Sequence, residues 1–289
     1  MTVVFLAALA GASFGALTVA VQWGIRRGAD FEAGALVAAT IGVVATATVA
    51  VPAAAVEGVD VVALLPFFGA GLIAPGASQI LLTLAVRHTG SSRVAILMGA
   101  APLISILMAL LLLDETFHLS LVIGTLLIVL GSIALVGKRA RLGRAGRRGA
   151  VLALLCAGLF AARDILLRGA VRDDDVSPLL AASSSLLAAA AFILVYLLLW
   201  HRERLRAGLL RAVPAFAPAG LALALGYGTL LMALDRGRVS VVSPLNATGS
   251  LWAVIFAALV IGRSEGINRR TVLAALLVVG GGALIGTFR

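Results

Sequence analysis

The chain has 289 residues, of which 62% are apolar and 12% are charged. A soluble domain carries about 25% charged residues, so this chain has too little polar surface for a globule in water. The composition therefore predicts a membrane protein. Its 23 basic and 13 acidic residues lie between apolar runs, without a basic stripe interleaved with aromatic residues. This pattern indicates membrane topology and excludes a nucleic-acid partner.

Ten apolar runs follow one another along the chain, each long enough for a helix across a hydrocarbon core of about 30 Å. They are 3–21, 33–51, 61–86, 94–113, 119–137, 150–167, 178–200, 212–234, 239–262 and 271–288. The runs lack the two-residue alternation of barrel strands. The predicted fold is an all-α polytopic membrane protein with ten transmembrane helices, which makes the lipid bilayer a partner. The first run has no basic region before it, so we expect it to be retained rather than cleaved.

The residues that could bind a metal are few. Cys156 is the only cysteine, which excludes an internal disulfide and a CxxC metal site. His88, His118 and His201 all fall at the edges of apolar runs, where interfacial side chains are expected. The sequence predicts neither a metal nor a cofactor.

A basic segment, KRARLGRAGRRG at 138–149, divides the chain almost in half. It is the predicted linker between a first repeat at 1–137 and a second at 150–289. AVRHTGSSRVA at 85–95 matches ALDRGRVSVV at 233–242 at an offset of about 148 residues. Five crossings are an odd number, so the second repeat should be inverted. Inverted repeats place a substrate site near the midplane and support alternating access.

Several of these segments carry a resemblance to a known family. They are the pair Phe14-Gly15 with Phe160 as its counterpart, the duplicated link, Pro102 inside the fourth run and the acidic end Asp114-Glu115. Together they resemble the EamA-type members of the drug/metabolite transporter superfamily. The resemblance implies a ten-helix carrier of small metabolites, often an exporter. It also implies a cavity lined by the first, third, fourth, sixth, eighth and ninth helices.

One run contains charged residues well inside it. In the sixth run Arg163 and Asp164 are consecutive, and a charge inside a span costs about 2.5–3.5 kcal/mol, so such residues suggest function. Consecutive helical side chains point about 100° apart. We therefore expect Asp164 to pair with Arg168 at i+4 and Arg163 to lack a local partner. Arg163 could then bind a carboxylate or phosphate, or its side chain could extend to the headgroups; Asp164 could bind an amine or carry a proton.

Neutral polar residues complete the predicted substrate site. Under the repeat offset Gln79 on the third helix corresponds to Tyr227 on the eighth, so the two should converge on the midplane. Asn246 on the ninth helix and Ser105 on the fourth are further candidates. The alternative for all four is helix packing.

Proline and glycine predict bends and close contacts. Pro66 and Pro75 in the third run and Pro102 in the fourth should each bend a helix and expose carbonyl groups or act as hinges. A set of glycines in the fifth and tenth runs should allow the terminal helices to pack closely. The set is Gly131, Gly137, Gly280, Gly281, Gly282 and Gly286.

Orientation has two conflicting indications. Most Lys and Arg residues lie in the odd-numbered loops, which would put those loops in the cytoplasm and both termini outside. Members of the superfamily are instead drawn with both termini in the cytoplasm. Lys138 is the only lysine among many arginines, which suggests a GC-rich bacterial genome and hence the inner membrane.

The leading hypothesis is a secondary transporter, an exporter of a small metabolite such as an amino acid or a nucleoside. No P-loop is present, and proton coupling would depend on Asp164 alone. The alternatives are a flippase for a lipid-linked substrate, a channel and an intramembrane enzyme. A channel would need a continuous polar lining, and the sequence lacks an HExxH motif and an embedded histidine, so we expect no enzyme. Substrate and oligomeric state are not predicted.

Overall fold

The protein is described from a computed structural model, which covers residues 2–57, 60–89, 97–98, 100–113, 118–136, 144–173, 176–260 and 269–286. Within these ranges all regular structure is helical and no β-strand occurs, which confirms the all-α prediction. Most of the first duplicated link and the acidic residues Asp114 and Glu115 lie outside the described residues.

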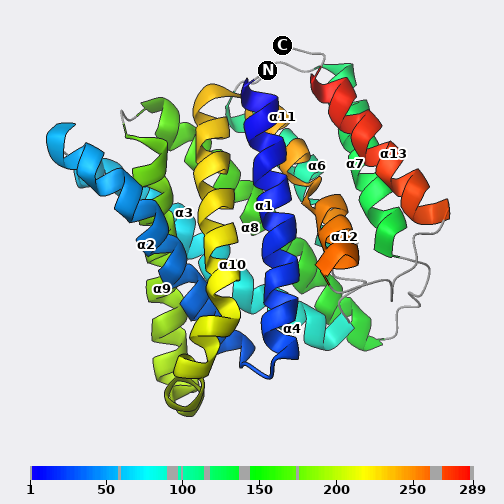
Figure 1. The fold of residues 1–289 in the computed structure, drawn as a ribbon. Coiled ribbons are helices and arrows are strands. Elements are labelled where there is room, and N and C mark those ends of the chain that lie inside the picture. The colour runs from blue at the N-terminus through cyan, green and yellow to red at the C-terminus, as the bar shows by residue number, and fades with distance from the viewer. Residues whose placement is uncertain are drawn as a thin grey trace.

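The helices follow the predicted runs along the chain (Figure 1). The first half contains α1 (Thr2–Arg26), α2 (Phe31–Glu57), a 3₁₀ turn (Val62–Leu64), α3 (Leu65–Gly71), a π-helical turn (Leu72–Ala77), α4 (Ser78–Thr89), α6 (Ala101–Leu112) and α7 (Leu119–Val136). The second half contains α8 (Arg144–Asp173), α9 (Pro178–Trp200), α10 (Arg202–Arg236), α11 (Val239–Asn246), α12 (Gly249–Val260) and α13 (Arg269–Gly286).

Seven segments among the described residues are long and apolar enough to cross a membrane. They are Thr2–Arg26, Phe31–Pro52, Val62–Leu82, Arg147–Val171, Pro178–Trp200, Gly208–Arg236 and Val239–Val260. Shorter apolar helices occupy the three other predicted runs, at Ala101–Leu112, Leu119–Gly131 and Leu276–Ile285. The chain is thus a polytopic membrane protein.

Part of the predicted linker is helical. The segment 138–149 is expected to be a linker, but residues 144–149 form the first turns of α8. Arginine and alanine are good helix formers, and no proline interrupts this stretch. The basic residues therefore lie at the start of the membrane span Arg147–Val171, and helix α8 begins three residues before that span.

Three predicted runs contain a break instead of one continuous helix. In the third run Ala74 has an extended backbone (φ −147°, ψ 123°) between helical neighbours. In the ninth run a turn separates the end of α11 at Asn246 from the start of α12 at Gly249. In the fourth run α6 begins at Ala101, directly after a turn residue. A broken helix frees backbone groups, and these need partners within the protein.

The prolines act differently from one another. Pro66 and Pro102 lie in the first turns of α3 and α6, where the missing N–H would have had no helical partner. These two begin helices, so the prediction that they bend a helix from within is wrong. Pro75 does lie at a break, next to Ala74.

The last helices of the two halves, α7 and α13, pack side by side (Figure 1). A Cβ atom on Gly281 would overlap the carbonyl oxygen of Gly124, and one on Gly131 would lie 2.8 Å from the carbonyl oxygen of Ala274. These glycines bring the two backbones together, as predicted for Gly131 and Gly281. Gly280 differs, since a Cβ there would meet nothing within 4 Å.

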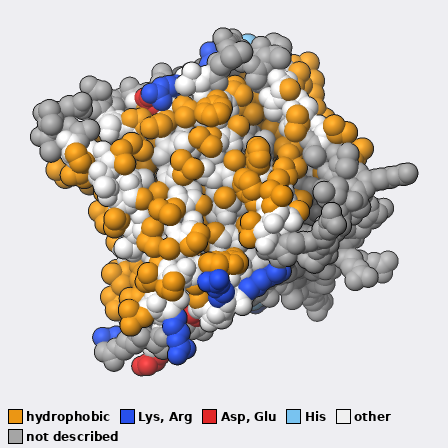
Figure 2. All heavy atoms as spheres, in the orientation of Figure 1, with side chains coloured by type: hydrophobic (Ala, Val, Ile, Leu, Met, Phe, Trp, Pro, Cys, Tyr) orange, Lys and Arg blue, Asp and Glu red, His pale blue; other side chains and the backbone are white. Residues whose placement is uncertain are grey.

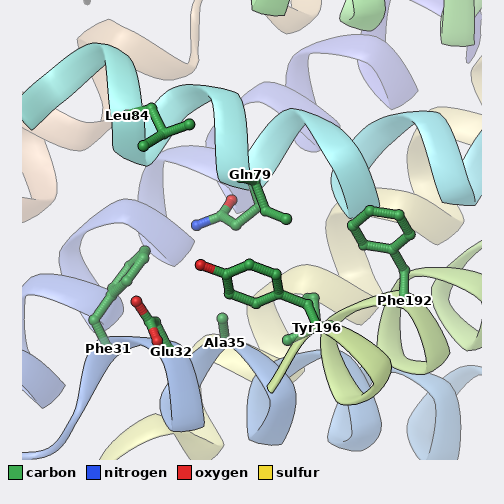
Figure 3. Close-up of a pocket in the computed structure, with 9 residues that line it drawn as sticks. Phe31, Glu32, Ala35, Gln79, Leu84, Phe192 and Tyr196 are labelled. Atoms are coloured by element: carbon green, nitrogen blue, oxygen red, sulfur yellow. The ribbon is translucent and has the colours of Figure 1, made fainter. Parts of the chain in front are cut away.

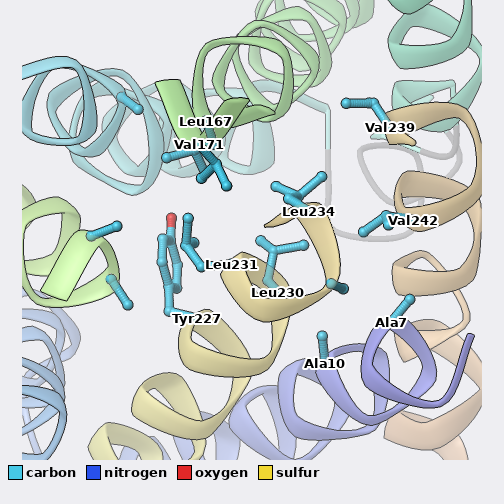
Figure 4. Packing of buried hydrophobic residues seen from close by; sticks show 14 of the residues in the cluster. Ala7, Ala10, Leu167, Val171, Tyr227, Leu230, Leu231, Leu234, Val239 and Val242 are labelled. Carbon is cyan, nitrogen blue, oxygen red and sulfur yellow. The ribbon is translucent and has the colours of Figure 1, made fainter. Parts of the chain in front are cut away.

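The apolar core lies where α1, α8, α10 and α11 meet (Figure 4). Tyr227 belongs to this cluster, together with Leu231 of its own helix and Leu167 and Val171 of α8. Tyr227 is the largest side chain with almost no exposure. The core therefore holds the side chain of Tyr227 in one place within the bundle.

The outside of the bundle suits a bilayer. Apolar side chains cover the middle of the face in Figure 2, and basic side chains lie toward its two ends. At the end of α1 the guanidinium of Arg27 lies 3.7 Å from the centre of the Trp23 ring, an arrangement typical of a membrane interface. The start of α1 and the end of α13 lie at the same end of the bundle (Figure 1), which agrees with an even number of crossings.

Candidate functional site

A cavity of about 310 Å³ lies between the broken fourth and ninth spans and α8. We call it the central cavity. Its lining is Met98, Ala101, Pro102, Ser105, Ile128, Val129, Phe160, Arg163, Asp164, Ser243, Asn246, Ala247 and Ser250. It brings together four predicted site residues, namely Arg163, Asp164, Ser105 and Asn246, from three different spans.

Arg163 and Asp164 form an ion pair with each other. Both the Nε and Nη2 atoms of Arg163 donate to Oδ1 of Asp164, at 3.1 and 2.6 Å. The prediction that neighbours cannot pair is wrong, because the long arginine side chain folds back across the 100° between them. Arg168 was the expected partner of Asp164; its Nη1 instead donates to the carbonyl oxygens of Leu234 and Asp235 on α10.

Arg163 does not extend toward the headgroups. Its exposed fraction is only 3%, and it lies eight residues before the end of the span at Val171, a depth of about 12 Å at 1.5 Å per residue. The guanidinium carbon lies 5.0 Å from the centre of the Phe160 ring and 5.5 Å from that of Tyr227. Aromatic faces stabilise a buried cation, so Arg163 is held inside the bundle.

Unpartnered polar atoms remain at the central cavity. Within the described part of the chain, the buried atoms Oγ of Ser105 and Oδ1 of Asn246 have no hydrogen-bond partner. The two hydrogen bonds from Arg163 to the carboxylate of Asp164 both end on Oδ1. The other carboxylate oxygen, Oδ2, can therefore accept a hydrogen bond. Buried polar groups without partners are rare and costly. These oxygens are therefore available to accept hydrogen bonds from a group in the cavity.

Tyr227 and Gln79 do not converge as predicted. Tyr227 lies behind the wall of the central cavity, where its hydroxyl accepts a hydrogen bond of 3.1 Å from Nη1 of Arg163. Gln79 lines a separate small pocket with Phe31, Glu32 and Tyr196 (Figure 3). The repeat offset used in the prediction relates the sequence positions of Gln79 and Tyr227, but their side chains lie at different sites.

Glu32 lines the Gln79 pocket but was not among the predicted site residues, and His201, expected only as an interfacial side chain, lies beside it. Glu32 lies in the first turn of α2. Its Oε2 atom lies 4.0 Å from Nε2 of His201, which in turn lies 3.2 Å from the hydroxyl of Tyr196. Both Glu32 and His201 fall just outside apolar runs, so a search for charge inside runs passes over them. The one available signal was that each of these residues directly adjoins a run.

Metal binding finds no support in the described residues, since no group of three or more His, Cys, Asp or Glu side chains there could hold an ion.

Phe160, which the sequence offered only as the counterpart of Phe14, lines the central cavity. Its signal was its position three residues before Arg163, one helical turn away.

Comparison with protein families settles the family. The model of the EamA-like transporter family matches twice, at residues 1–137 and 147–287. The chain belongs to the EamA-like transporter family. It is thus a multi-pass membrane transporter of the drug/metabolite type rather than an enzyme.

Solved structures share the fold of this chain. One of the most similar, titled only "Crystal structure of protein", has a TM-score of 0.77 and 19% identity. The match covers 98% of this chain and 94% of the other. At that identity the likeness concerns the fold alone. No curated protein matches the chain.

Proposed function

We propose that this EamA-like protein is a secondary transporter that exports a small metabolite through the central cavity by alternating access. The observation that carries the proposal is the ion pair of Arg163 and Asp164, buried at the wall of a cavity inside a membrane bundle. Charges at such depth are costly and mark substrate or ion pathways. Export is the direction that the family likeness implies.

The substrate should carry hydrogen-bond donors, above all a protonated amine. The positive charge of Arg163 is compensated by Asp164 and its Nη1 is engaged by Tyr227, so little is left for an anion. Oδ2 of Asp164 and Oδ1 of Asn246 are acceptors, and the hydroxyl of Ser105 can serve either way. An ammonium group matches these oxygens, whereas a phosphate of a lipid-linked substrate would have to displace Asp164 first. The flippase alternative is therefore disfavoured.

Alternating access is supported by the arrangement of the two halves. α6 begins at Ala101 and α12 at Gly249, each after a break, an offset of about 148 residues that repeats the one found in the sequence. Broken helices at corresponding positions of two halves are the usual pointer to a transporter's binding site. We therefore keep the two inverted five-helix repeats as part of the proposal, with the inner membrane as the location.

Transport can be tested with three compounds that share one carbon skeleton: leucine, 3-methylbutylamine without the carboxylate, and 4-methylpentanoate without the amine. Proteoliposomes loaded with each unlabelled compound are given its labelled form, and counterflow is measured. We expect exchange of the two amines and little of the acid. Asp164→Asn should abolish it, while Asp235→Asn, an exposed acid of α10, should not. Exchange of the acid alone, or of none of the three, would contradict the proposal.

A further inference from the structure

A chain of hydrogen bonds joins the central cavity to the break in the third span. Nη1 of Arg163 donates to the hydroxyl of Tyr227 at 3.1 Å, and that hydroxyl donates to the carbonyl oxygen of Ala74 at 2.9 Å. The three residues come from α8, α10 and the segment between α3 and α4. One side-chain hydroxyl therefore links a cavity residue to a distant backbone irregularity.

The carbonyl of Ala74 needs such a partner. Ala74 is the one residue with non-helical angles in its π-helical turn, and it is completely buried. A buried backbone carbonyl without a hydrogen bond is rare and costly. Because the helix is interrupted there, Tyr227 supplies the hydrogen bond from another span.

The position of Tyr227 is fixed by more than this bond. Its ring meets the ring of Phe14 edge-on, at a centroid distance of 5.9 Å and an interplanar angle of 81°, and its side chain is 1% exposed. The ring has little room to move. The variable part of the chain of bonds is therefore the guanidinium of Arg163 on the cavity side.

Asp164 sets where that guanidinium lies. It accepts from Nε and Nη2, which turns Nη1 toward Tyr227. A cation bound at Oδ2 of Asp164, or a proton there, would weaken the attraction that holds Arg163 in place. The hydroxyl of Tyr227 would then lose its donor, and its own bond to the carbonyl of Ala74 would weaken, because hydrogen bonds linked in a chain strengthen one another.

We propose that Tyr227 is a coupling residue, which transmits the charge state of Asp164 to the break at Ala74. This inference rests on the proposed function only in taking Asp164 as the residue that meets the substrate. Discontinuous helices form the binding sites of many transporters, and alternating access moves one bundle against the other around them. Tyr227 thus connects occupancy of the cavity to a segment able to change its conformation, and it does so without lining the cavity itself.

The experiment measures amide hydrogen exchange of a peptide covering 72–84 in the full chain in lipid nanodiscs, with no ligand added. Asp164→Asn mimics the neutral state and should speed exchange of this peptide by about threefold or more. Tyr227→Phe, which keeps the ring and removes the hydroxyl, should also speed it. In the double variant Asp164→Asn should have no further effect, because its influence passes through the missing hydroxyl.

Thr229→Val is the matched control. It removes a buried hydroxyl two residues away on α10 that bonds only to its own helix, so exchange at 72–84 should stay unchanged. If Tyr227→Phe does not fold, Arg163→Lys serves instead, because a single ammonium cannot hold Asp164 and Tyr227 at once; we expect the same faster exchange. Additive effects of the two substitutions, or an Asp164→Asn variant that exchanges like the wild type, would overturn the coupling.

The result is separable from the transport test because no substrate is present. If the wild type shows no amine counterflow, but the effects of the two substitutions on hydrogen exchange are not additive, the proposed substrate class is rejected and the coupling stands. Amine counterflow together with additive exchange would reject Tyr227 as the coupling residue and leave the transport proposal standing.

Discussion

Arg163 and Asp164 are consecutive residues of α8, and their Nη2 and Oδ1 atoms are 2.6 Å apart. The pair lies in the interior of the bundle, where each charge alone would be strongly disfavoured. The sequence indicates that both charges are embedded, while only the structure shows that they neutralise each other. Under the proposed function, a free arginine would favour an anionic substrate, whereas the paired arginine favours a substrate that donates hydrogen bonds to the remaining oxygens.

The pair should behave as a unit in stability measurements. Replacing Arg163 with Met leaves the carboxylate of Asp164 buried and unpaired, and we expect a loss of roughly 3–5 kcal/mol. The double variant Arg163→Met with Asp164→Leu removes both charges and should recover most of that loss. Thermal unfolding in detergent checks this. A double variant no more stable than the single one would show that the two charges are not paired in the folded protein.

Substitutions in the central cavity should weaken ligand binding, whereas a substitution in the Gln79 pocket should not. Asn246→Ala and Ser105→Ala each remove a polar atom of the central cavity, and we expect each to weaken binding of 3-methylbutylamine about tenfold, near the value of one hydrogen bond to a charged group. Gln79→Ala changes a different pocket and should alter affinity less than about twofold. Ligand-induced thermal shifts give the three affinities. A large loss with Gln79→Ala alone would place the substrate in the Gln79 pocket.

The fold could be predicted from the sequence further than the site could. Run length and composition are sufficient to locate each apolar helix, since a span needs about 20 apolar residues. The breaks were less visible: Pro102 and Pro66 were expected within helices, but each begins one. Proline shows that a regular helix is disturbed nearby, and it does not show on which side the disturbance falls.

Residue type was enough to name four residues that line the central cavity, but their contacts were not predicted. Arg163, Asp164, Ser105 and Asn246 were named from the cost of polar groups in a membrane, and they line one cavity. Whether two side chains touch depends on rotamers and on the neighbouring helices. For that reason the i+4 rule gave Asp164 the wrong partner.

A proton gradient should drive transport only while Asp164 can be protonated. We propose that a proton and the amine compete for its carboxylate, so that an inward gradient drives export of the amine. In proteoliposomes with an imposed pH gradient, the wild type should accumulate labelled 3-methylbutylamine against its concentration gradient. Asp164→Asn should abolish accumulation, and Asp235→Asn should keep it. Equal accumulation with and without the gradient in the wild type would point to a facilitator.

The packing of α7 against α13 should depend on Gly281 and not on its neighbour Gly280. Gly281 faces Gly124 so closely that a Cβ atom would overlap the opposing backbone, while Gly280, next to it, faces open space. Gly281→Ala must push the helices apart, and we expect a loss of about 1–3 kcal/mol, the usual cost of overpacking. Gly280→Ala should be neutral or gain up to about 1 kcal/mol, because alanine favours the helix. Thermal unfolding of the two variants in the same detergent makes the comparison; equal stability of the two would mean that α7 and α13 do not approach through Gly281.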